Sequence, residues 1–175
     1  MNVFRKLAAL FGRQREQQIG NEDKMIVSTK GNEQPSPYQS DKPNAYTSSR
    51  VTPEYISVLQ PNEVFVFGSN VRGMHYGGAA AFAVGRFGAI MGQGEGLQGQ
   101  SYAIPTMEGL ENMRAAVDRF IAFAQEHTEL TFLVTPIGCG IAGYTPAEIA
   151  PLFAAAKTLD NVHLPNSFWN CLSTK

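Results

Sequence analysis

The chain has 175 residues, of which 43% are hydrophobic and 17% are charged, and its formal net charge is −1. This length suits one well-buried domain and is short for two. The charge is uneven, since residues 1–50 hold eight Lys or Arg against five Asp or Glu, whereas residues 51–175 hold six against ten. An acidic C-terminal part argues against nucleic acid as a partner but leaves room for one small phosphate ligand held by backbone groups.

Only two cysteines are present, Cys139 and Cys171. Two cysteines make no disulfide framework, so a reducing cytoplasm is the expected compartment. No apolar run approaches the roughly 20 residues of a membrane span. The apolar N-terminal stretch is interrupted by Arg5, Lys6 and Arg13 and lacks a convincing cleavage site, so no signal peptide is predicted.

The first 50 residues differ in composition from the rest. Residues 3–11 have the pattern of a short amphipathic helix, which could dock a partner or a membrane surface. We prefer the interpretation that they form only a frayed turn, because so short a helix is marginal on its own. Residues 12–50 are rich in Gln, Asn, Ser, Lys and Pro and nearly lack large aliphatic side chains. This composition predicts a disordered tail that ends near Arg50, with residues 51–175 forming the folded domain.

The remaining elements alternate between strands and helices. Thr52-Pro53-Glu54 has the composition of a helix start, and that helix would stop at Pro61. The pattern then predicts, in order, a strand at Glu63–Gly68, a loop at 69–78, a small-residue helix at Gly78–Phe87, a glycine-rich loop at 92–100, a strand at Ser101–Pro105, a helix at Leu110–His127, a strand at Leu130–Thr135, a helix at Pro146–Leu159 and a strand at Asn161–Leu164.

This alternation predicts an α/β fold with a mainly parallel sheet. The helix at 110–127 is the clearest, because Met113, Val117, Phe120, Ile121 and Ala124 form one apolar stripe. Pro151 inside the next helix should bend it or tighten its first turn. Ligands in such folds lie beyond the carboxyl ends of the strands, so the loops at 68–78 and 136–144 should open at one edge.

The stretch Thr131–Glu148 (TFLVTPIGCGIAGYTPAE) organises the domain. A buried strand leads through Gly138, Gly140 and Gly143 to a helix start that carries a Thr, a Pro and a Glu in capping-box positions. Glycine loops before a helix present bare N–H groups to anions, so we predict a phosphate site; a tight turn without a ligand is the alternative. Gly138, Gly140 and Gly143 formally match the GxGxxG pattern of dinucleotide-binding domains. A dinucleotide-dependent oxidoreductase has an acidic residue after the next strand, and this sequence has none there.

Four further residues are candidates for chemistry. Asn70 can donate to and accept from a ribose hydroxyl, although a loop-capping role is the more common one. His75 is a candidate acid or base, and Glu95 can act as an acid or base or hold a water. Cys139 would need a neighbouring base to be a nucleophile. Each has a plainer interpretation as a loop residue, and the His and Cys residues show no zinc-like spacing, so no metal site or cofactor is predicted.

These loops together resemble the macro domain, and the resemblance covers about residues 62–165. Val64–Asn70 (VFVFGSN) resembles the strand that ends in the family's ligand-contacting asparagine, and Gly77-Gly78-Ala79 resembles the glycine run that opens the next helix. Gly99–Thr106 resembles the following strand, and Val134–Pro146 resembles the second phosphate loop. The closest likeness is to a divergent subgroup found in bacterial and phage proteins; Ala142 stands where many members have an aromatic residue, and residues 50–63 show no counterpart of the Gly-Asp-Ile motif that reads adenine.

The resemblance implies a three-layer α/β/α domain that binds ADP-ribose or a related nucleotide. Whether it also hydrolyses an ADP-ribosyl bond is left open, and the candidate residues for that step are Asn70, Glu95 and His75. It implies the following ligand-binding residues: Gly68, Ser69, Asn70, Gly77, Gly78, Gly138, Cys139, Gly140, Ile141, Ala142, Gly143 and Tyr144. The alternative is a non-enzymatic scaffold whose N-terminal tail docks a protein partner.

Overall fold

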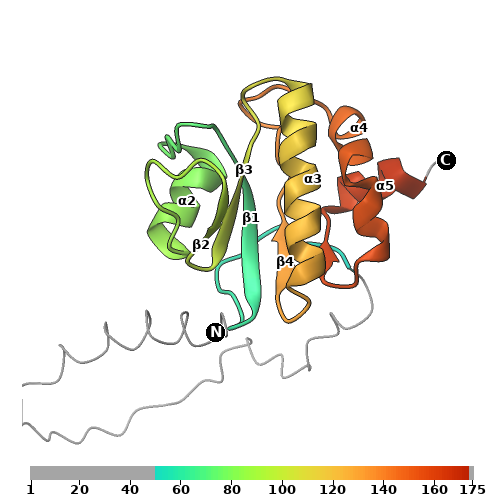
Figure 1. Cartoon of the computed structure of the whole chain (residues 1–175), viewed down its shortest axis with the longest axis horizontal. Helices are drawn as coiled ribbons and strands as arrows, with labels where there is room; N and C mark the ends of the chain where they lie inside the picture. The colour runs from blue at the N-terminus through green and yellow to red at the C-terminus, as the bar shows by residue number, and fades with distance from the viewer. Residues whose placement is uncertain (1–49, 174–175) are drawn as a thin grey trace, which may run out of the picture. The chain divides into compact units, whose positions relative to one another are not determined.

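The computed structural model describes residues 50–173, and the predicted helix at 3–11 and the predicted tail at 12–49 lie outside this range. The described residues form an α/β domain with a five-stranded sheet (Figure 1). Its elements, in chain order, are β1 (Glu63–Ser69), α2 (Gly78–Arg86), β2 (Gly96–Gln98), β3 (Ser101–Pro105), α3 (Leu110–Glu126), β4 (Thr131–Val134), α4 (Pro146–Ile149), the 3-10 helix η1 (Ala150–Thr158), β5 (Val162–His163) and α5 (Asn166–Ser173).

The sheet has the strand order β2-β3-β1-β4-β5. β1 lies at its centre and pairs in parallel with both β3 and β4, with Phe65 opposite Ser101 on one side and Leu133 on the other. β4 also pairs in parallel with β5, and only the short β2 is antiparallel. The predicted mainly parallel sheet is therefore confirmed, and the carboxyl ends of β1, β3 and β4 lie side by side.

Helices cover both faces of the sheet because the side chains of β1 alternate between two cores. Val64 and Val66 enter a large cluster with residues of α3, η1 and α5. Phe65 and Phe67 enter a smaller cluster with Ala80 and the other small residues of α2. The sheet thus lies between α2 on one side and α3, η1 and α5 on the other, as Figure 1 shows.

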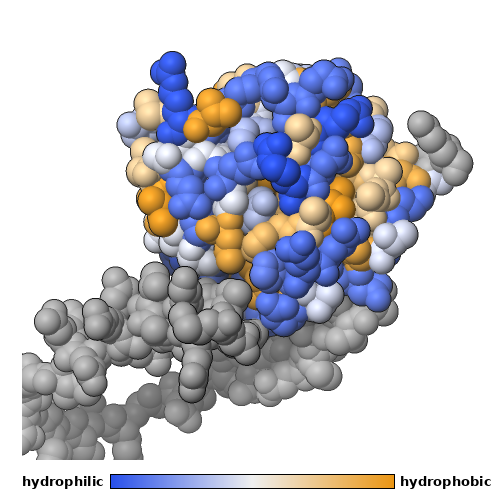
Figure 2. All heavy atoms as spheres, viewed as in Figure 1, coloured by the Kyte–Doolittle hydropathy of each residue, from blue (hydrophilic) through white to orange (hydrophobic). Residues whose placement is uncertain are grey.

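α3 follows its sequence pattern closely. All five residues of its predicted apolar stripe are buried, and they face the larger core. Its exposed residues are polar except for Ala115 and Ala122, and they contribute to the blue surface in the centre of Figure 2. The period of 3.6 residues alone was sufficient to predict this helix and its buried side.

The helix predicted at Pro146–Leu159 is divided. It begins as α4, and it tightens into η1 at Ala150, one residue before Pro151. Pro151 has no N–H to donate and its ring crowds the preceding turn, which explains why α-helical geometry ends there.

Three segments differ from their predictions. Residues 52–60 form no helix, because Thr52 is held extended: its N–H donates to Leu164 O and its hydroxyl donates to His163 O. The glycine-rich loop at 92–100 contains β2, which pairs with β3. α5 was not predicted, although Pro165 before a run of apolar residues was a usable start signal.

Among residues 50–173, no helix is long and apolar enough to cross a membrane.

Candidate functional site

A cleft of about 360 Å³ lies at the carboxyl ends of β1, β3 and β4. The two predicted glycine loops form its walls, so they do open at one edge of the sheet. Its lining residues are Gly68, Ser69, Asn70, Met74, Tyr76, Gly77, Gly78, Ala79, Ala80, Thr106, Met107, Thr135, Pro136, Ile137, Gly138, Gly140, Ile141 and Ala142. None of these side chains carries a formal charge, so the donors that the lining offers to an anion are peptide N–H groups and neutral polar side chains.

The N-terminus of α2 forms one wall of the cleft. Its first residues are small, and no side chain caps its N-terminal N–H groups. The N-cap residue is Gly77, and the first turn contains no acidic residue. Four N–H groups at a helix start have no partner within the helix, and the helix dipole adds positive potential there. This end of α2 therefore presents free donors to the cleft.

The loop after β4 forms the opposite wall. Gly138 has a φ of +73°, a backbone conformation that favours glycine. The N–H groups of Gly138, Gly140, Ile141 and Ala142 donate to none of the residues that the structure describes, and all four residues line the cleft. A run of unpaired peptide donors on a concave surface is a common anion-binding arrangement.

The start of α4, the helix after this loop, is less available for anion binding than its sequence predicts. The carboxylate of Glu148 accepts hydrogen bonds from the N–H and the hydroxyl of Thr145, each at 2.8 Å, which forms the predicted capping box. Because these hydrogen bonds stabilise the anionic form, they lower the pKa of Glu148. The N-terminus of α4 is thus already occupied by the protein's own carboxylate, whereas that of α2 is not.

Asn70 lines the cleft and also closes its own loop. Its Nδ2 donates to Met74 O at 3.1 Å, and its Oδ1 accepts from the Met74 N–H at 3.2 Å. Asn70 therefore has the loop-capping role in the structure. Both the nitrogen and the oxygen of its side-chain amide are hydrogen-bonded to Met74 while the residue lines the cleft.

Ser69 and His75 form a buried polar pair behind this loop. Ser69 Oγ lies 2.8 Å from His75 Nε2, and the His75 ring lies edge-on to Phe67. His75 is only 2% exposed, and its burial lowers the pKa of the imidazole. His75 itself is not among the lining residues, but its partner Ser69 is.

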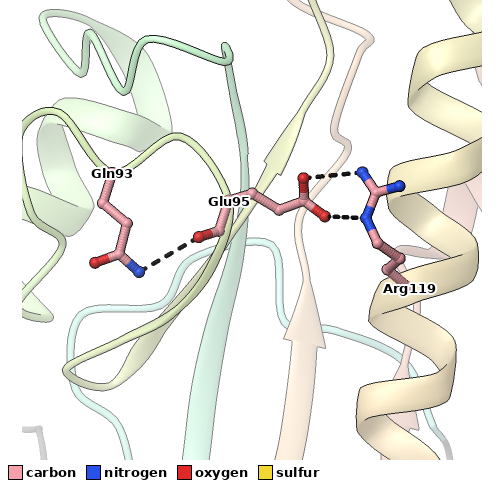
Figure 3. Close-up of polar contacts among 3 residues, drawn as sticks. All are labelled: Gln93, Glu95 and Arg119. Carbon is pink, nitrogen blue, oxygen red and sulfur yellow. Dashed lines mark hydrogen bonds and ion pairs between the residues drawn. The ribbon is translucent and has the colours of Figure 1, made fainter.

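Glu95 is not brought to the cleft. Its carboxylate instead forms a two-pronged ion pair with Arg119 of α3, with Nε–Oε1 and Nη2–Oε2 distances of 2.6 Å and 2.9 Å (Figure 3). Its backbone oxygen accepts from Gln93 Nε2. Glu95 therefore fastens the segment before β2 to α3, and the structure gives no support to a role in acid–base chemistry at the cleft.

Three other predicted ligand residues shape the loop without lining the cleft. The Cys139 N–H donates to Pro136 O, the Gly143 N–H to Gly140 O and the Tyr144 N–H to Gly138 O. Burial is the main cause that raises the pKa of the Cys139 thiol, which does not favour a nucleophilic thiolate. The remaining nine predicted ligand residues all line the cleft.

Tyr76 is the one aromatic residue in the lining of this cleft among the described residues, and it is 75% exposed. It lies on the loop after β1, across from the loop that contains Ala142. The sequence alone leaves open which of Tyr76, Tyr102, Tyr144 and Trp169 could stack on a ligand. Tyr102 is excluded because it is buried in the larger core, and the Trp169 indole N–H donates to Arg50 O.

A second hollow of about 690 Å³ adjoins the cleft, and sequence reasoning missed it. The two share Ala79, Thr135 and Pro136. The other lining residues of the second hollow are Thr52, Pro53, Glu54, Tyr55, Ile56, Ser57, Phe65, Phe82, Pro165, Asn166 and Ser167. Six of these residues belong to the segment 52–60 that the sequence predicts as a helix and that the structure shows without one.

No group of three or more His, Cys, Asp or Glu side chains among residues 50–173 could hold a metal ion. Comparison of the chain with protein-family models, with curated proteins and with solved structures finds no match in any of the three.

Proposed function

We propose that the domain is macro-like and binds ADP-ribose or a closely related nucleotide diphosphate across the two adjoining hollows. The diphosphate and its ribose would lie in the glycine-walled cleft, and the base would lie in the second hollow. The observation that carries this proposal is that two sets of residues with unpaired N–H groups line one cleft: Gly138 and residues 140–142 on one wall, and the start of α2 on the other.

The chemistry of the cleft supports a diphosphate. Peptide N–H groups and a helix N-terminus stabilise negative charge without a lysine or arginine. The volumes of about 360 Å³ and 690 Å³ fall within the roughly 300–1,000 Å³ of small-molecule sites. A single phosphate would fill only part of this space, which favours a larger ligand.

The second hollow has the groups that a purine base needs. Tyr55, which is 87% exposed, and Phe82 offer aromatic surfaces, and the Glu54 carboxylate can accept a hydrogen bond from an exocyclic amine. In the macro domain an Asp that reads adenine precedes the first strand. Glu54 also precedes the first long strand, β1, so it is the residue that we propose for this contact.

Binding is the activity proposed, because the lining of the glycine-walled cleft contains no acidic, basic or histidine side chain. Asn70, the one member of the predicted catalytic trio in the lining, uses its amide to close a loop. Hydrolysis in the cleft would therefore need an acid or base outside the lining that exchanges a proton with a neutral lining residue.

Calorimetric titration with ADP-ribose, NAD, AMP, inorganic pyrophosphate and a nucleic-acid oligomer tests the proposal. ADP-ribose should bind more tightly than either fragment, because pyrophosphate lacks the base and AMP lacks the second phosphate and the second ribose. Glu54→Gln should weaken ADP-ribose and AMP while leaving pyrophosphate unchanged. Absence of ADP-ribose binding, or equal affinity for ADP-ribose and the oligomer, would refute it.

A further inference from the structure

The Ser69–His75 pair is the one part of the cleft that the proposed function leaves unexplained. Ser69 is the last residue of β1, the central strand, and it lines the cleft. Two hydrogen bonds from Thr106 hold the backbone of Ser69 in place: its carbonyl oxygen accepts from the Thr106 N–H at 2.9 Å and from the Thr106 hydroxyl at 3.2 Å. The 2.8 Å contact between Ser69 Oγ and His75 Nε2 is shorter than the 3.2 Å contact between Ser69 Oγ and Asn70 O.

His75 has a polar atom that nothing in the described part of the chain satisfies. Nδ1 is buried and has no hydrogen-bond partner. The Ser69 hydroxyl proton can go to His75 Nε2 or, at 3.2 Å, to Asn70 O, and either choice leaves Nδ1 unpaired. Such a buried group costs free energy, and a catalytic role is one of the explanations for its presence in a folded protein.

The surroundings keep this imidazole neutral. Burial is the cause that lowers its pKa, and neither the ring's neighbour Phe67 nor the cleft lining contributes a charged group. A neutral imidazole within hydrogen-bond reach of a hydroxyl can accept its proton near neutral pH.

We propose that Ser69 and His75 are a nucleophile–base pair that cleaves a carboxylic ester presented in the cleft. Ser69 Oγ attacks the carbonyl carbon as its proton passes to His75 Nε2, and the ester C–O bond then breaks as Nε2 returns that proton to the departing alcohol. Water attacks the acyl-serine in the same way, giving its proton to Nε2 and then to Ser69 Oγ, so the net reaction is ester plus water to acid plus alcohol. Unpaired N–H groups of the same cleft are available to stabilise the oxyanion. This inference uses the cleft but does not depend on which nucleotide it binds.

A fluorophosphonate probe tests the pair on the full chain, with the adduct located by peptide mass spectrometry. Wild type should form one adduct, on Ser69, and should hydrolyse p-nitrophenyl acetate; Ser69→Ala should do neither. His75→Gln keeps a hydrogen-bonding group near Ser69 but cannot act as the base, so labelling should slow by roughly a hundredfold or more. Ser173→Ala is the matched serine control, because Ser173 is exposed on α5 and lines neither hollow, and it should label as wild type does.

The pH dependence of wild-type labelling provides a second criterion that holds even where His75→Gln fails to fold. The rate should rise with pH and level off, with a midpoint below 6.5, because the base is active when neutral. No adduct, an adduct elsewhere, wild-type labelling of His75→Gln, or a rate independent of pH between 5 and 8 would each overturn the inference. ADP-ribose affinity is measured separately by calorimetry on Ser69→Ala, so failure of this proposal and failure of the nucleotide proposal are distinguishable.

Discussion

Asn70 combines two roles that sequence reasoning treated as alternatives. Its amide closes residues 70–74 into a loop through both the N–H and the oxygen of Met74, and the same residue lines the cleft. Asn70→Ala should lower the free energy of unfolding by about 1–3 kcal/mol, since each lost hydrogen bond contributes roughly 1 kcal/mol. It should also weaken ligand binding, because the loop would lose its fixed shape.

Thermal unfolding and calorimetry on this variant give the two readouts. Asn112→Ala is a suitable control, because Asn112 donates a single exposed hydrogen bond to Glu108 O, away from the cleft lining. An Asn70→Ala protein with wild-type stability and wild-type affinity would contradict the loop-closing role.

Glu95 illustrates how a residue with suitable chemistry can be engaged elsewhere. Its ion pair with Arg119 is largely solvent-exposed, so solvent screening limits its contribution to stability to about 1 kcal/mol or less. Glu95→Gln should therefore reduce the free energy of unfolding only slightly and leave ADP-ribose affinity and any ester hydrolysis unchanged. Arg119→Gln, which breaks the same ion pair, is measured beside it. Loss of ADP-ribose affinity or of ester hydrolysis in Glu95→Gln alone would show that Glu95 takes part in the site.

At the scale of elements, the second glycine-rich loop supports the cleft from outside. The Gly92 N–H donates to Gly73 O at 2.9 Å, and a Cβ on Gly94 would overlap the backbone oxygens of Asn70 and Val71. Gly94→Ala should therefore cost about 1–3 kcal/mol of stability, as overpacking does, and displace the 70–74 loop. The matched control is Gly85→Ala in α2, where a Cβ meets nothing within 4 Å and should be neutral or stabilising. Equal denaturation midpoints for the two variants would refute this role.

Elements with a strong local pattern could be predicted from the sequence. The helix at 110–126 follows directly from its hydrophobic periodicity, and the strand predicted at 101–105 has the same bounds as β3. The segment at 52–60 could not, because hydrogen bonds from Thr52 to residues more than 100 positions away override its local helix-start signal. The same long-range pairing creates the second hollow, so a local analysis could not find it.

The placement of the candidate site depended on topology more than on local pattern. Parallel pairing of β1 with β4 predicts that the loops after them meet, and they do. The partners of individual side chains could not be predicted from the sequence. No local pattern indicates that Glu95 pairs with Arg119 or that Ser69 pairs with His75.

At the scale of the whole molecule, the chain divides between Thr47 and Ser48. Arg50 belongs to the folded unit, because its guanidinium donates to Leu159 O at 2.6 Å and lies over the Trp169 ring. A truncated chain that begins at Ser48 should therefore keep its unfolding midpoint and its nucleotide affinity, whereas Arg50→Ala in that chain should lower the midpoint. Loss of nucleotide binding on truncation would instead implicate residues 1–47 in the site; retained binding with loss of a protein partner would favour the tethering alternative.

The most direct test of anion binding by the α2 N-terminus compares Gly77→Asp with Gly77→Asn by calorimetric titration with ADP-ribose. Gly77 is the uncapped N-cap residue, its backbone is extended, and a Cβ there meets nothing within 4 Å. Either side chain should cap the helix and raise stability by a few tenths of a kcal/mol, but only the Asp places a negative charge where the diphosphate would lie. The account predicts clear binding by wild type and Gly77→Asn and at least a tenfold loss in Gly77→Asp. Equal ADP-ribose affinity in the two variants, or no binding by wild type, would contradict it.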